Sequence, residues 1–424
     1  MEKIKIFEAF SGFGSFALTL KGLQFVNPNF DFEIVGISEI DKDAIKAYKT
    51  LHGIIRNYGD IRKVKWDKVP DFNLFTYSYP CQSISRIGKK QGMKEGSGTE
   101  SSLVWFCKDA IMLKNPTFLI MENVKELLSK ENQEDFEKWQ TFLTKLGYRN
   151  YIKVLNAKDY GIPQNRERVF LISIKGEHPS YKFPEPFPLK NKFPSFLDKK
   201  THPKYYVNAD SSGVHSRKRI DELIESGVIN PYRRQWIDLY SKTAKEDVIS
   251  TITTRIFGSG NFLIHEYNYQ LRKPTPRECF RFMGLDEISI GKLLNLNLKP
   301  SKYYHLAGNS IVIDVLYFLF YNLFYPDDIC HYKESYPYRK LRIMEYAIKY
   351  RYKGKINLIE QIDPITKRVI NVFTSVRDAA SHLGNINNIN LFSNINKACK
   401  DPKKRVSGYF FRVKELDLQD KENQ

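Results

Sequence analysis

The sequence predicts an α/β protein: a Rossmann-like, mostly parallel sheet, then a smaller second domain and a small α+β C-terminal module. Three observations support this fold class. Apolar runs of strand length alternate with helical segments from the N-terminus to about residue 174. A glycine-rich turn, Ser11-Gly12-Phe13-Gly14, follows the first of these runs. Polar residues able to do chemistry follow several later runs, and open α/β sheets bind their ligands beyond the carboxyl ends of strands.

Length and composition describe a globular protein with a basic surface. The 424 residues are enough for two or three domains. Lys and Arg number 67 against 48 Asp and Glu, a formal charge of +19, which favours a polyanionic partner such as nucleic acid. A solvated lysine-rich surface would have the same composition. The five cysteines are scattered without metal-ligand spacing, so we expect no metal site, no disulfide framework and a cytoplasmic location.

The N-terminal part has the pattern of a nucleotide-binding unit. Residues 4–10 alternate as a strand, the glycine turn follows, and residues 16–21 are expected to be helical. Glycine lets the backbone approach a ligand closely, and the N-terminus of a helix offers free N–H groups. The turn lacks the spacing Gly-x-Gly-x-x-Gly, so a dinucleotide is not specifically indicated. By itself the pattern is equally consistent with a plain tight turn.

Acidic residues follow the next strand. A strand at 32–37 ends at Glu39-Ile40-Asp41, where a carboxylate is placed to accept hydrogen bonds from ribose hydroxyls. We expect Glu39 to bind the sugar and Asp41 to cap the following helix. Residues 59–61, Gly-Asp-Ile, are expected to end a third short strand and could hold the edge of an adenine. Together these features describe a nucleoside pocket.

Cys81 follows the apolar run 72–78 and Pro80, which cannot extend a strand ladder. Its position beyond a strand end makes it a candidate nucleophile, and a buried structural cysteine is the alternative. Residues 82–98 are polar and rich in glycine and lysine, which indicates a mobile loop rather than core. This favours the nucleophile.

Three further side chains are candidates for the chemistry. Glu122 follows the predicted strand 117–121 and could act as a general acid if burial raises its pKa. The alternative is a surface glutamate that opens a helix at 125–130. Arg166 and Arg168 alternate at the start of another strand and so are expected on one face. Paired arginines indicate contacts with an anion or a base, with salt bridges as the alternative.

Eight short motifs occur in the order found in the C5-cytosine DNA methyltransferases, and the chain resembles that family from about residue 4 to residue 324. The motifs are Phe10-Ser-Gly-Phe-Gly14, Glu39-Ile-Asp41, Gly59-Asp-Ile61, Pro80-Cys-Gln82, Glu122-Asn-Val124, Gln164-x-Arg166-x-Arg168, Arg277-Glu278 with Arg281 and Gly284, and Gly308-Asn309-Ser310. Any one would occur by chance, whereas all eight in order would not. Two departures, Glu100 for a frequent arginine and Met283 for a frequent glutamine, remove no reacting group.

The resemblance implies a methyltransferase sheet that uses S-adenosylmethionine as methyl donor, without a metal. The residues that it implies for binding the donor are Phe10, Gly12, Phe13, Gly14, Glu39, Ile40, Asp60, Ile61, Pro80, Leu103, Asn309 and Ser310. It also implies that a buried helix at 311–325, too short to span a bilayer, returns beside the glycine turn.

The resemblance also implies the catalytic roles. The Cys81 thiolate is expected to add to C6 of cytosine, and Glu122 to protonate or hydrogen-bond N3. Arg168 would hold O2. Arg166 is a further catalytic candidate, whose positive charge would favour the thiolate.

A cytosine inside a duplex must be flipped out before its C5 can react, and we expect the loop 82–98 to act as a lid. Its expected DNA contacts are Gln82, Ser83, Ser85 and Lys89, with the serines helping to fill the gap left by the base. A plain surface loop is the alternative.

The predicted domain boundaries place a catalytic domain at 1–180 plus 300–326 and a target-recognition domain at 181–299. Arg255, in the strand-like segment 250–261, is a candidate base or phosphate contact, with a scaffold role as the alternative.

The family pattern ends near residue 325, and a C-terminal extension follows. We expect a basic connector at 327–355 and a DNA-binding module at 356–414 that resembles the small helix-turn-helix modules of phage and intron-encoded endonucleases. Its expected elements are a hairpin at 362–373, helices at 374–384 and 394–400, and a strand at 408–412. A packing appendage is the alternative.

The expected function is a monomeric DNA (cytosine-5)-methyltransferase that acts on a specific duplex sequence, in restriction-modification or phage DNA protection. A cognate endonuclease would act separately, and no membrane is involved. The alternatives are a transfer-RNA cytosine-5 methyltransferase and a non-catalytic DNA-binding protein on the same scaffold. The length of the recognition region favours DNA, and intact Cys81, Glu122 and Arg168 favour catalysis.

Overall fold

The computed structural model describes residues 2–27, 29–80, 93–207, 214–254, 262–326, 355–362, 369–373, 389–401, 403–407 and 409–417. The chain divides into two compact units. The first comprises residues 1–20, 31–285 and 289–334, and the second comprises residues 21–30, 286–288 and 335–424. The predicted domain boundaries stay predictions.

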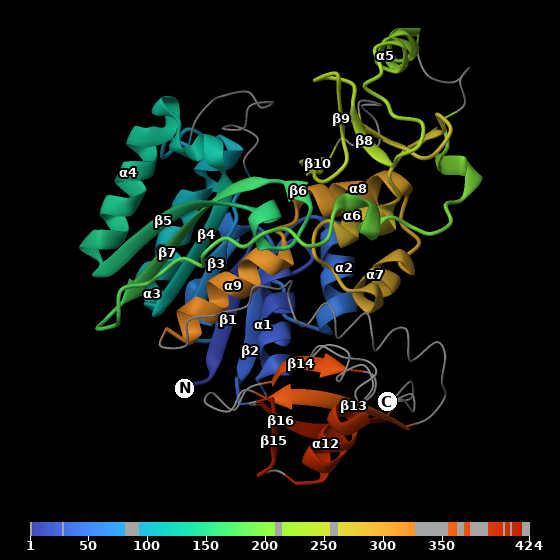
Figure 1. Ribbon diagram of the computed structural model, residues 1–424. Helices are drawn as coiled ribbons and strands as arrows, with labels where there is room; N and C mark the ends of the chain where they lie inside the picture. Colours follow the sequence, from blue (N-terminus) through green and yellow to red (C-terminus); the bar gives the residue numbers. More distant parts are fainter. Residues whose placement is uncertain are drawn as a thin grey trace. The chain divides into compact units, whose positions relative to one another are not determined.

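A six-stranded mixed sheet forms the centre of the first unit (Figure 1). In sheet order its strands are β2 (Phe32–Ser38), β1 (Ile4–Ala9), β3 (Leu74–Tyr77), β4 (Phe118–Val124), β7 (Glu167–Lys175) and β5 (Tyr148–Asn156). Strands β2, β1, β3 and β4 pair in parallel, whereas β7 runs antiparallel to both β4 and β5. The predicted Rossmann-like α/β sheet is confirmed.

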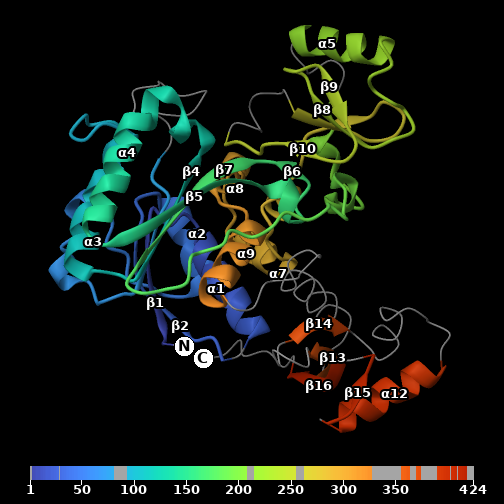
Figure 2. The same cartoon turned by 60° about the vertical axis from the view of Figure 1, so that its left-hand side comes forward.

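Helices cover both faces of this sheet (Figures 1 and 2). One face carries α3 (Cys107–Lys114) and α4 (Lys130–Lys145), and the other carries α1 (Ser15–Val26), α2 (Lys42–His52) and α9 (Ile313–Phe324). Strand β3 is buried throughout, as expected of a strand covered on both sides. On the α4 face, the indole N–H of Trp139 donates to the Tyr77 hydroxyl at 3.1 Å.

Helix α9 is the apolar helix predicted at 311–325, and nearly all of its side chains are buried. By length and composition the stretch Pro300–Phe324 could cross a membrane, but 89% of its apolar 18-residue window is buried inside the protein, as in the core helix of a globular domain. The rings of Phe320 and Phe16 lie 6.0 Å apart, so α9 packs beside the helix that follows the glycine turn. This confirms the predicted return of the helix.

Two predicted elements are wrong. Residues 59–61 do not form a strand: the bridge to β2 is made by Asn57 alone, and Asp60 then caps the 3₁₀ turn η1 (Ile61–Lys63). The expected helix at 125–130 is a 3₁₀ turn, η4 (Lys125–Leu128), after which α4 begins at Lys130. The other 3₁₀ turns of the described residues are η2 (Trp66–Lys68), η3 (Glu100–Phe106), η5 (Ala157–Tyr160), η6 (Phe193–Phe196) and η7 (Pro203–Tyr205).

The predicted recognition region contains a second sheet of four antiparallel strands. In sheet order they are β12 (Leu271–Arg272), β11 (Phe262–His265), β8 (Gln235–Asp238) and β9 (Thr243–Lys245). Side chains of α5 (Val214–Glu225), among them Leu223, pack with Ile237 and Leu263 of this sheet. The remaining helices are α6 (Pro276–Arg281), α7 (Glu287–Leu294) and α8 (Pro300–Asn309).

A short parallel pair joins this region to the main sheet. β10 (Ile249–Ser250) pairs with β6 (Gln164–Asn165), which directly precedes β7. Residues 251–254 continue without strand structure, so the strand predicted across 250–261 is limited in the described residues to Ser250.

In the second unit, residues 355–417 form a four-stranded antiparallel sheet with one described helix. The strands are, in sheet order, β14 (Val369–Phe373), β13 (Lys355–Ile362), β16 (Tyr409–Asp417) and β15 (Arg405–Val406). The helix α12 (Ile389–Lys400) packs Ile395 and Ala398 against Ile359 and Phe411. The predicted hairpin is confirmed as β13–β14. The helix predicted at 374–384 lies outside the described residues, so the helix-turn-helix likeness stays a prediction.

Candidate active site

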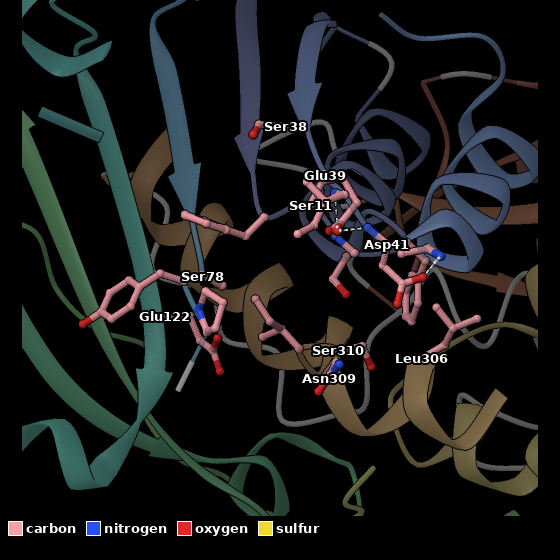
Figure 3. Close-up of a pocket in the computed structure, with 18 of the residues that line it drawn as sticks. Ser11, Ser38, Glu39, Asp41, Ser78, Glu122, Leu306, Asn309 and Ser310 are labelled. Carbon is pink, nitrogen blue, oxygen red and sulfur yellow. Dashed lines mark hydrogen bonds between the residues drawn. The ribbon is translucent and has the colours of Figure 1, made fainter. Parts of the chain in front are cut away.

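A cavity of about 300 Å³ lies where the carboxyl ends of β1, β2, β3 and β4 meet (Figure 3). Figure 3 places Glu122 at one end and Glu39 with Asp41 at the other, while Asn309 and Ser310 line a wall at the end of α8. Of the residues predicted to bind the methyl donor, all but Gly14 line the cavity: Phe10, Gly12, Phe13, Glu39, Ile40, Asp60, Ile61, Pro80, Leu103, Asn309 and Ser310.

The turn after β1 depends on left-handed backbone conformations. Phe10 and Gly12 both have φ of 56°, and Gly14 has φ of 86°. The backbone N–H of Phe10 donates to the carbonyl of Ser38 at 2.8 Å, which joins this turn to the end of β2. A Cβ atom on Gly14 would lie 2.4 Å from Nε2 of His52. Gly14 therefore lets α2 approach the turn, and its predicted contact with the donor stays a prediction.

The carboxylate of Glu39 connects the first two loops of the site. Its Oε2 accepts a hydrogen bond from the N–H of Gly12 at 2.8 Å, and its Oε1 accepts from the N–H groups of Ile40 and Asp41 at 2.8 and 2.9 Å. Asp41 caps α2 as predicted, because its side chain accepts from two N–H groups of the first helical turn. The capping role predicted for Asp41 is confirmed, and the predicted contact of Glu39 with a ribose stays a prediction.

The third loop brings Asp60 to the cavity. Both carboxylate oxygens of Asp60 pair with the guanidinium of Arg62, which was not predicted. This hydrogen bonding holds the pKa of Asp60 below its ordinary value, so the group is a carboxylate acceptor at neutral pH. Nearby Ile40 leaves 67% of its surface exposed at the cavity, an unusual degree for an isoleucine.

The chain is anchored from two sides where β3 ends. The side-chain amide of Asn123, on β4, donates to the carbonyl of Tyr79 at 3.2 Å. The hydroxyl of Ser101 donates to the carbonyl of Pro80 at 2.9 Å. Asn123 and Tyr79 are buried, so these bonds are protected from water. The position of the residue before Cys81 is therefore fixed by two neighbouring elements.

Glu122 and Arg168 form the charged pair of the site. Strand β7 runs antiparallel to β4, so its first residues lie beside the carboxyl end of β4, where Val124 pairs with Arg168. Oε1 of Glu122 lies 3.2 Å from Nε of Arg168. Burial raises the pKa of Glu122 above its ordinary value, although Arg168, Arg166 and Ser78 act in the opposite direction. The predicted buried acid is thus present, and a surface role is excluded because Glu122 is only 7% exposed.

Arg166 lines the same cavity, but its guanidinium points to backbone carbonyls. Its Nη1 donates to the carbonyl of Ile252 at 2.8 Å, and its Nη2 donates to those of Gly308 and Ser310 at 2.9 and 2.7 Å. The residue is 4% exposed. These contacts fix the walls of the site, and the predicted catalytic role of Arg166 stays a prediction.

Six residues predicted to act at the site lie outside the described residues: Cys81, Gln82, Ser83, Ser85, Lys89 and Arg255. Conversely, several cavity residues were not predicted as site residues, including Ser11, Ser38, Ser78, His305 and Leu306. The three serines adjoin named motifs and could have been found from their position at strand ends. His305 and Leu306 belong to α8, and no local pattern places that helix at the cavity.

Comparison with known proteins identifies the family. The model of a family described as C-5 cytosine-specific DNA methylase matches residues 4–325. The chain belongs to this family. It is a DNA (cytosine-5)-methyltransferase with double-stranded DNA as substrate, and the transfer-RNA and non-catalytic alternatives are not favoured.

Curated relatives agree with this assignment, and a solved structure agrees with the fold. The chain is 32% identical to a Type II methyltransferase, M2.ScrFI, of Lactococcus lactis subsp. cremoris, over 76% of this chain and 99% of the relative. It is 29% identical to the Type II methyltransferase M.HhaI of Haemophilus parahaemolyticus, over 76% of this chain and 94% of the relative. The solved methyltransferase EhMeth of Entamoeba histolytica shares the fold, with a TM-score of 0.61 and 18% identity over 77% of this chain and all of that one.

The cavity suits S-adenosylmethionine, the methyl donor of the family. The carboxylates of Glu39 and Asp60 can accept hydrogen bonds from ribose hydroxyls and an adenine amino group. The exposed side chain of Ile40 offers an apolar surface for the flat adenine ring. The donor carries positive charge, which several carboxylates at the cavity wall favour.

Proposed function

We propose that this protein methylates C5 of a flipped-out cytosine in a specific duplex sequence through a covalent bond between Cys81 and C6. The observation that supports this most directly is the buried pair of Glu122 and Arg168 beside the donor cavity. The anchored Pro80 adjoins them, and the next residue of the chain is Cys81.

The first step of the proposed reaction is nucleophilic. C5 of cytosine is a poor nucleophile until a group adds to C6, and the Cys81 thiolate supplies that group. A free thiol with a pKa of about 8.5 is only a few per cent ionised at neutral pH, so neighbouring positive charge increases the reactive fraction. The guanidinium group of Arg168 provides such charge at the cavity.

The attack of the thiolate pushes electron density into the cytosine ring, and the site must stabilise the negative charge that develops on N3 and O2. Glu122 donates its proton to N3, and Arg168 donates a hydrogen bond to O2. S-adenosylmethionine, when bound, supplies an electrophilic methyl group. C5 takes up the methyl group, and S-adenosylhomocysteine leaves. C5 then gives its proton to water, N3 returns its proton to Glu122, and the Cys81 thiolate leaves C6 to restore the aromatic ring.

The loop 82–98 is proposed to close over the extruded base. Extrusion costs a few kcal/mol of unstacking, which contacts to the DNA must offset. Gln82, Ser83 and Ser85 are proposed to occupy the gap in the duplex, and Lys89 to contact phosphate. Gln82 to Lys89 directly follow the proposed nucleophile in the chain, which supports a shared movement.

Sequence recognition is assigned to residues 181–299, with Arg255 as a base or phosphate contact. The segment 249–254, which leads to Arg255, is held against the catalytic sheet by the β6–β10 pair. We further propose an enzyme of a restriction-modification system, which the Type II names of the relatives support. A separate endonuclease, a cytoplasmic location and a monomeric state are further parts of this proposal.

The C-terminal unit is proposed to add non-specific DNA affinity. Lys397 and Lys400 of α12 are exposed, as are Lys403 and Arg405 at β15. Such a group of cations binds phosphates with a strong dependence on salt. A truncation after Tyr325 should weaken DNA binding and flatten its dependence on salt concentration. If both stay unchanged, this part of the proposal is wrong.

The main proposal is tested by expression in a host that lacks cytosine methylation, followed by sequencing of its DNA for 5-methylcytosine. One modified motif is expected. An unmodified genome together with modified transfer RNA would contradict the proposed substrate.

The covalent step is tested with DNA that contains 5-fluorocytosine, which traps the enzyme because the fluorine cannot leave as a proton does. Wild-type protein should form a stable adduct, and Cys81→Ser should form none. Cys107→Ser is the matched control, because Cys107 is buried in the core and burial raises its pKa far above the ordinary value. An adduct with Cys81→Ser would exclude Cys81 as the nucleophile.

A further inference from the structure

Arg166 joins two segments that lie far apart in the chain. One is the segment 249–254, which continues into the proposed recognition loop, and the other is the turn 308–310, which lines the donor cavity. The carbonyl of Ile252 in the first segment and those of Gly308 and Ser310 in the second all accept hydrogen bonds from the Arg166 guanidinium. A buried guanidinium needs such partners, because removing it from water is costly.

The two segments also touch each other directly at Gly308. A Cβ atom on this glycine would lie 2.4 Å from the backbone nitrogen of Thr254 and 2.5 Å from the carbonyl carbon of Thr253. Real Cβ atoms do not come so close to backbone. Both sides of the contact are backbone in a close-packed interior, so Gly308 lets the two segments pack side by side, where the hydrogen bonds of Arg166 join them.

Other contacts hold the recognition segment to the sheet but do not reach the donor cavity turn. Oε1 of Gln164 accepts from the N–H of Ile252 at 2.9 Å, and its Nε2 donates to the carbonyl of Phe282 at 2.7 Å. The hydroxyl of Thr251 donates to the carbonyl of Asn165 at 2.7 Å. Of the three side chains Gln164, Arg166 and Thr251, only Arg166 has described hydrogen bonds both to the segment 249–254 and to the turn 308–310.

We propose that Arg166 is a positioning residue that couples the donor cavity to the DNA-recognition segment, rather than a group that contacts the reacting cytosine. This inference rests on the proposed function and assigns the contact with the base to Arg168, whose Nε lies beside Glu122. When a bound donor orders the turn 308–310, it favours the arrangement of residues 249–254 in which Arg166 can hydrogen-bond to both segments. By thermodynamic linkage, specific DNA must then increase the affinity for the donor by the same factor by which the donor increases the affinity for specific DNA.

The coupling is measured by binding alone. S-adenosylhomocysteine, the product that remains after methyl transfer, serves as the probe of the donor cavity. For wild-type protein, we expect it to lower the Kd for specific duplex DNA by a factor of about five or more, the lower end of usual allosteric coupling. In Arg166→Met this factor should fall to about one, and the preference for specific over non-specific DNA should fall with it.

A matched variant separates coupling from simple loosening of the recognition segment. Thr251→Val removes a hydrogen bond from the same segment without touching Arg166 or the turn 308–310. It should weaken specific DNA binding while the coupling factor stays at its wild-type value. Arg166→Lys keeps the charge but can bridge fewer carbonyls, so it should give an intermediate factor.

Kinetics distinguish a positioning residue from a catalytic one. With saturating donor and DNA, the single-turnover rate of Arg166→Met should stay within about tenfold of wild type, whereas Arg168→Met should lose about a hundredfold or more, as for removal of a transition-state donor. If Arg166→Met loses as much as Arg168→Met with its coupling factor unchanged, Arg166 acts on the base and the proposal is wrong. A wild-type coupling factor of one would also overturn it.

Failure of the proposed function gives a different result. If wild-type protein binds specific DNA and S-adenosylhomocysteine with coupling but forms no 5-methylcytosine, the proposed reaction is wrong and the coupling stands. If Arg166→Met does not fold, as judged by its thermal transition, Arg166→Lys carries the same comparison.

Discussion

Replacing Glu122 by glutamine removes a proton donor while keeping a side chain of nearly the same size. The carboxyl is 7% exposed, and its burial raises the pKa more than Arg168, 3.2 Å away, lowers it. A carboxyl with a raised pKa keeps its proton closer to neutral pH and can give it to cytosine N3. General acids of this kind contribute about 10²–10⁴-fold, or about 3–5 kcal/mol of the barrier, and we expect kcat of Glu122→Gln to fall by that factor.

The dependence on pH provides the sharper test. The acid form of Glu122 is lost as pH rises through its raised pKa, so the wild-type single-turnover rate should decline over that range. Glutamine does not ionise there, so the residual rate of Glu122→Gln should lack this decline. The assay is transfer of a radiolabelled methyl group to duplex DNA at a series of pH values, with folding checked by circular dichroism.

Glu167→Gln is the control for this experiment. Glu167 begins the neighbouring strand and pairs with Lys125 at the surface, so its neutralisation should leave the rate and its pH dependence unchanged. A Glu122→Gln variant within a few-fold of wild type, or one that keeps the wild-type decline with pH, would refute the assignment of Glu122 as the acid.

Other predictions concern stability and are read from chemical denaturation. Because its pKa is raised, Glu122 binds its proton more tightly in the folded protein than in the unfolded chain. The stability of the wild type should therefore fall as pH rises from the ordinary pKa of 4.5 through the raised pKa. Above that range Glu122→Gln should be more stable than the wild type, and a less stable variant would contradict this. Gly308→Ala has no room for its methyl group and should lose about 1–3 kcal/mol together with DNA specificity. Gly291→Ala in α7 should not, because a Cβ atom there has no other atom within 4 Å. Arg272→Met should cost about 3–5 kcal/mol, because it removes the buried guanidinium that pairs with two buried carboxylates. Glu278 then loses its arginine partner, whereas Glu266 keeps Arg234. A loss below that of an ordinary surface change would show that Glu278 is neutral.

Much of the site could be predicted because its residues lie next to strand ends in the chain. Glu39 and Pro80 each follow a strand within a few residues, and parallel strands bring their carboxyl ends to the same edge. Asp41 could be assigned as a helix cap for the same reason, since capping is a local interaction. The short strand expected at 59–61 was wrong because its apolar pattern is too brief to distinguish a strand from a 3₁₀ turn.

The sequence by itself determined the family, the α/β class and the order of the site loops, because these depend on contiguous motifs and local periodicity. Only the tertiary structure decided that Gly14 and Gly308 are required by close approach of other segments, since those neighbours are distant in the chain. It also decided the pKa direction of Glu122, which follows from burial against opposing charges. Arg166 is the clearest case. Its carbonyl partners lie 86 to 144 residues away, and no local pattern encodes such contacts because packing alone brings them together.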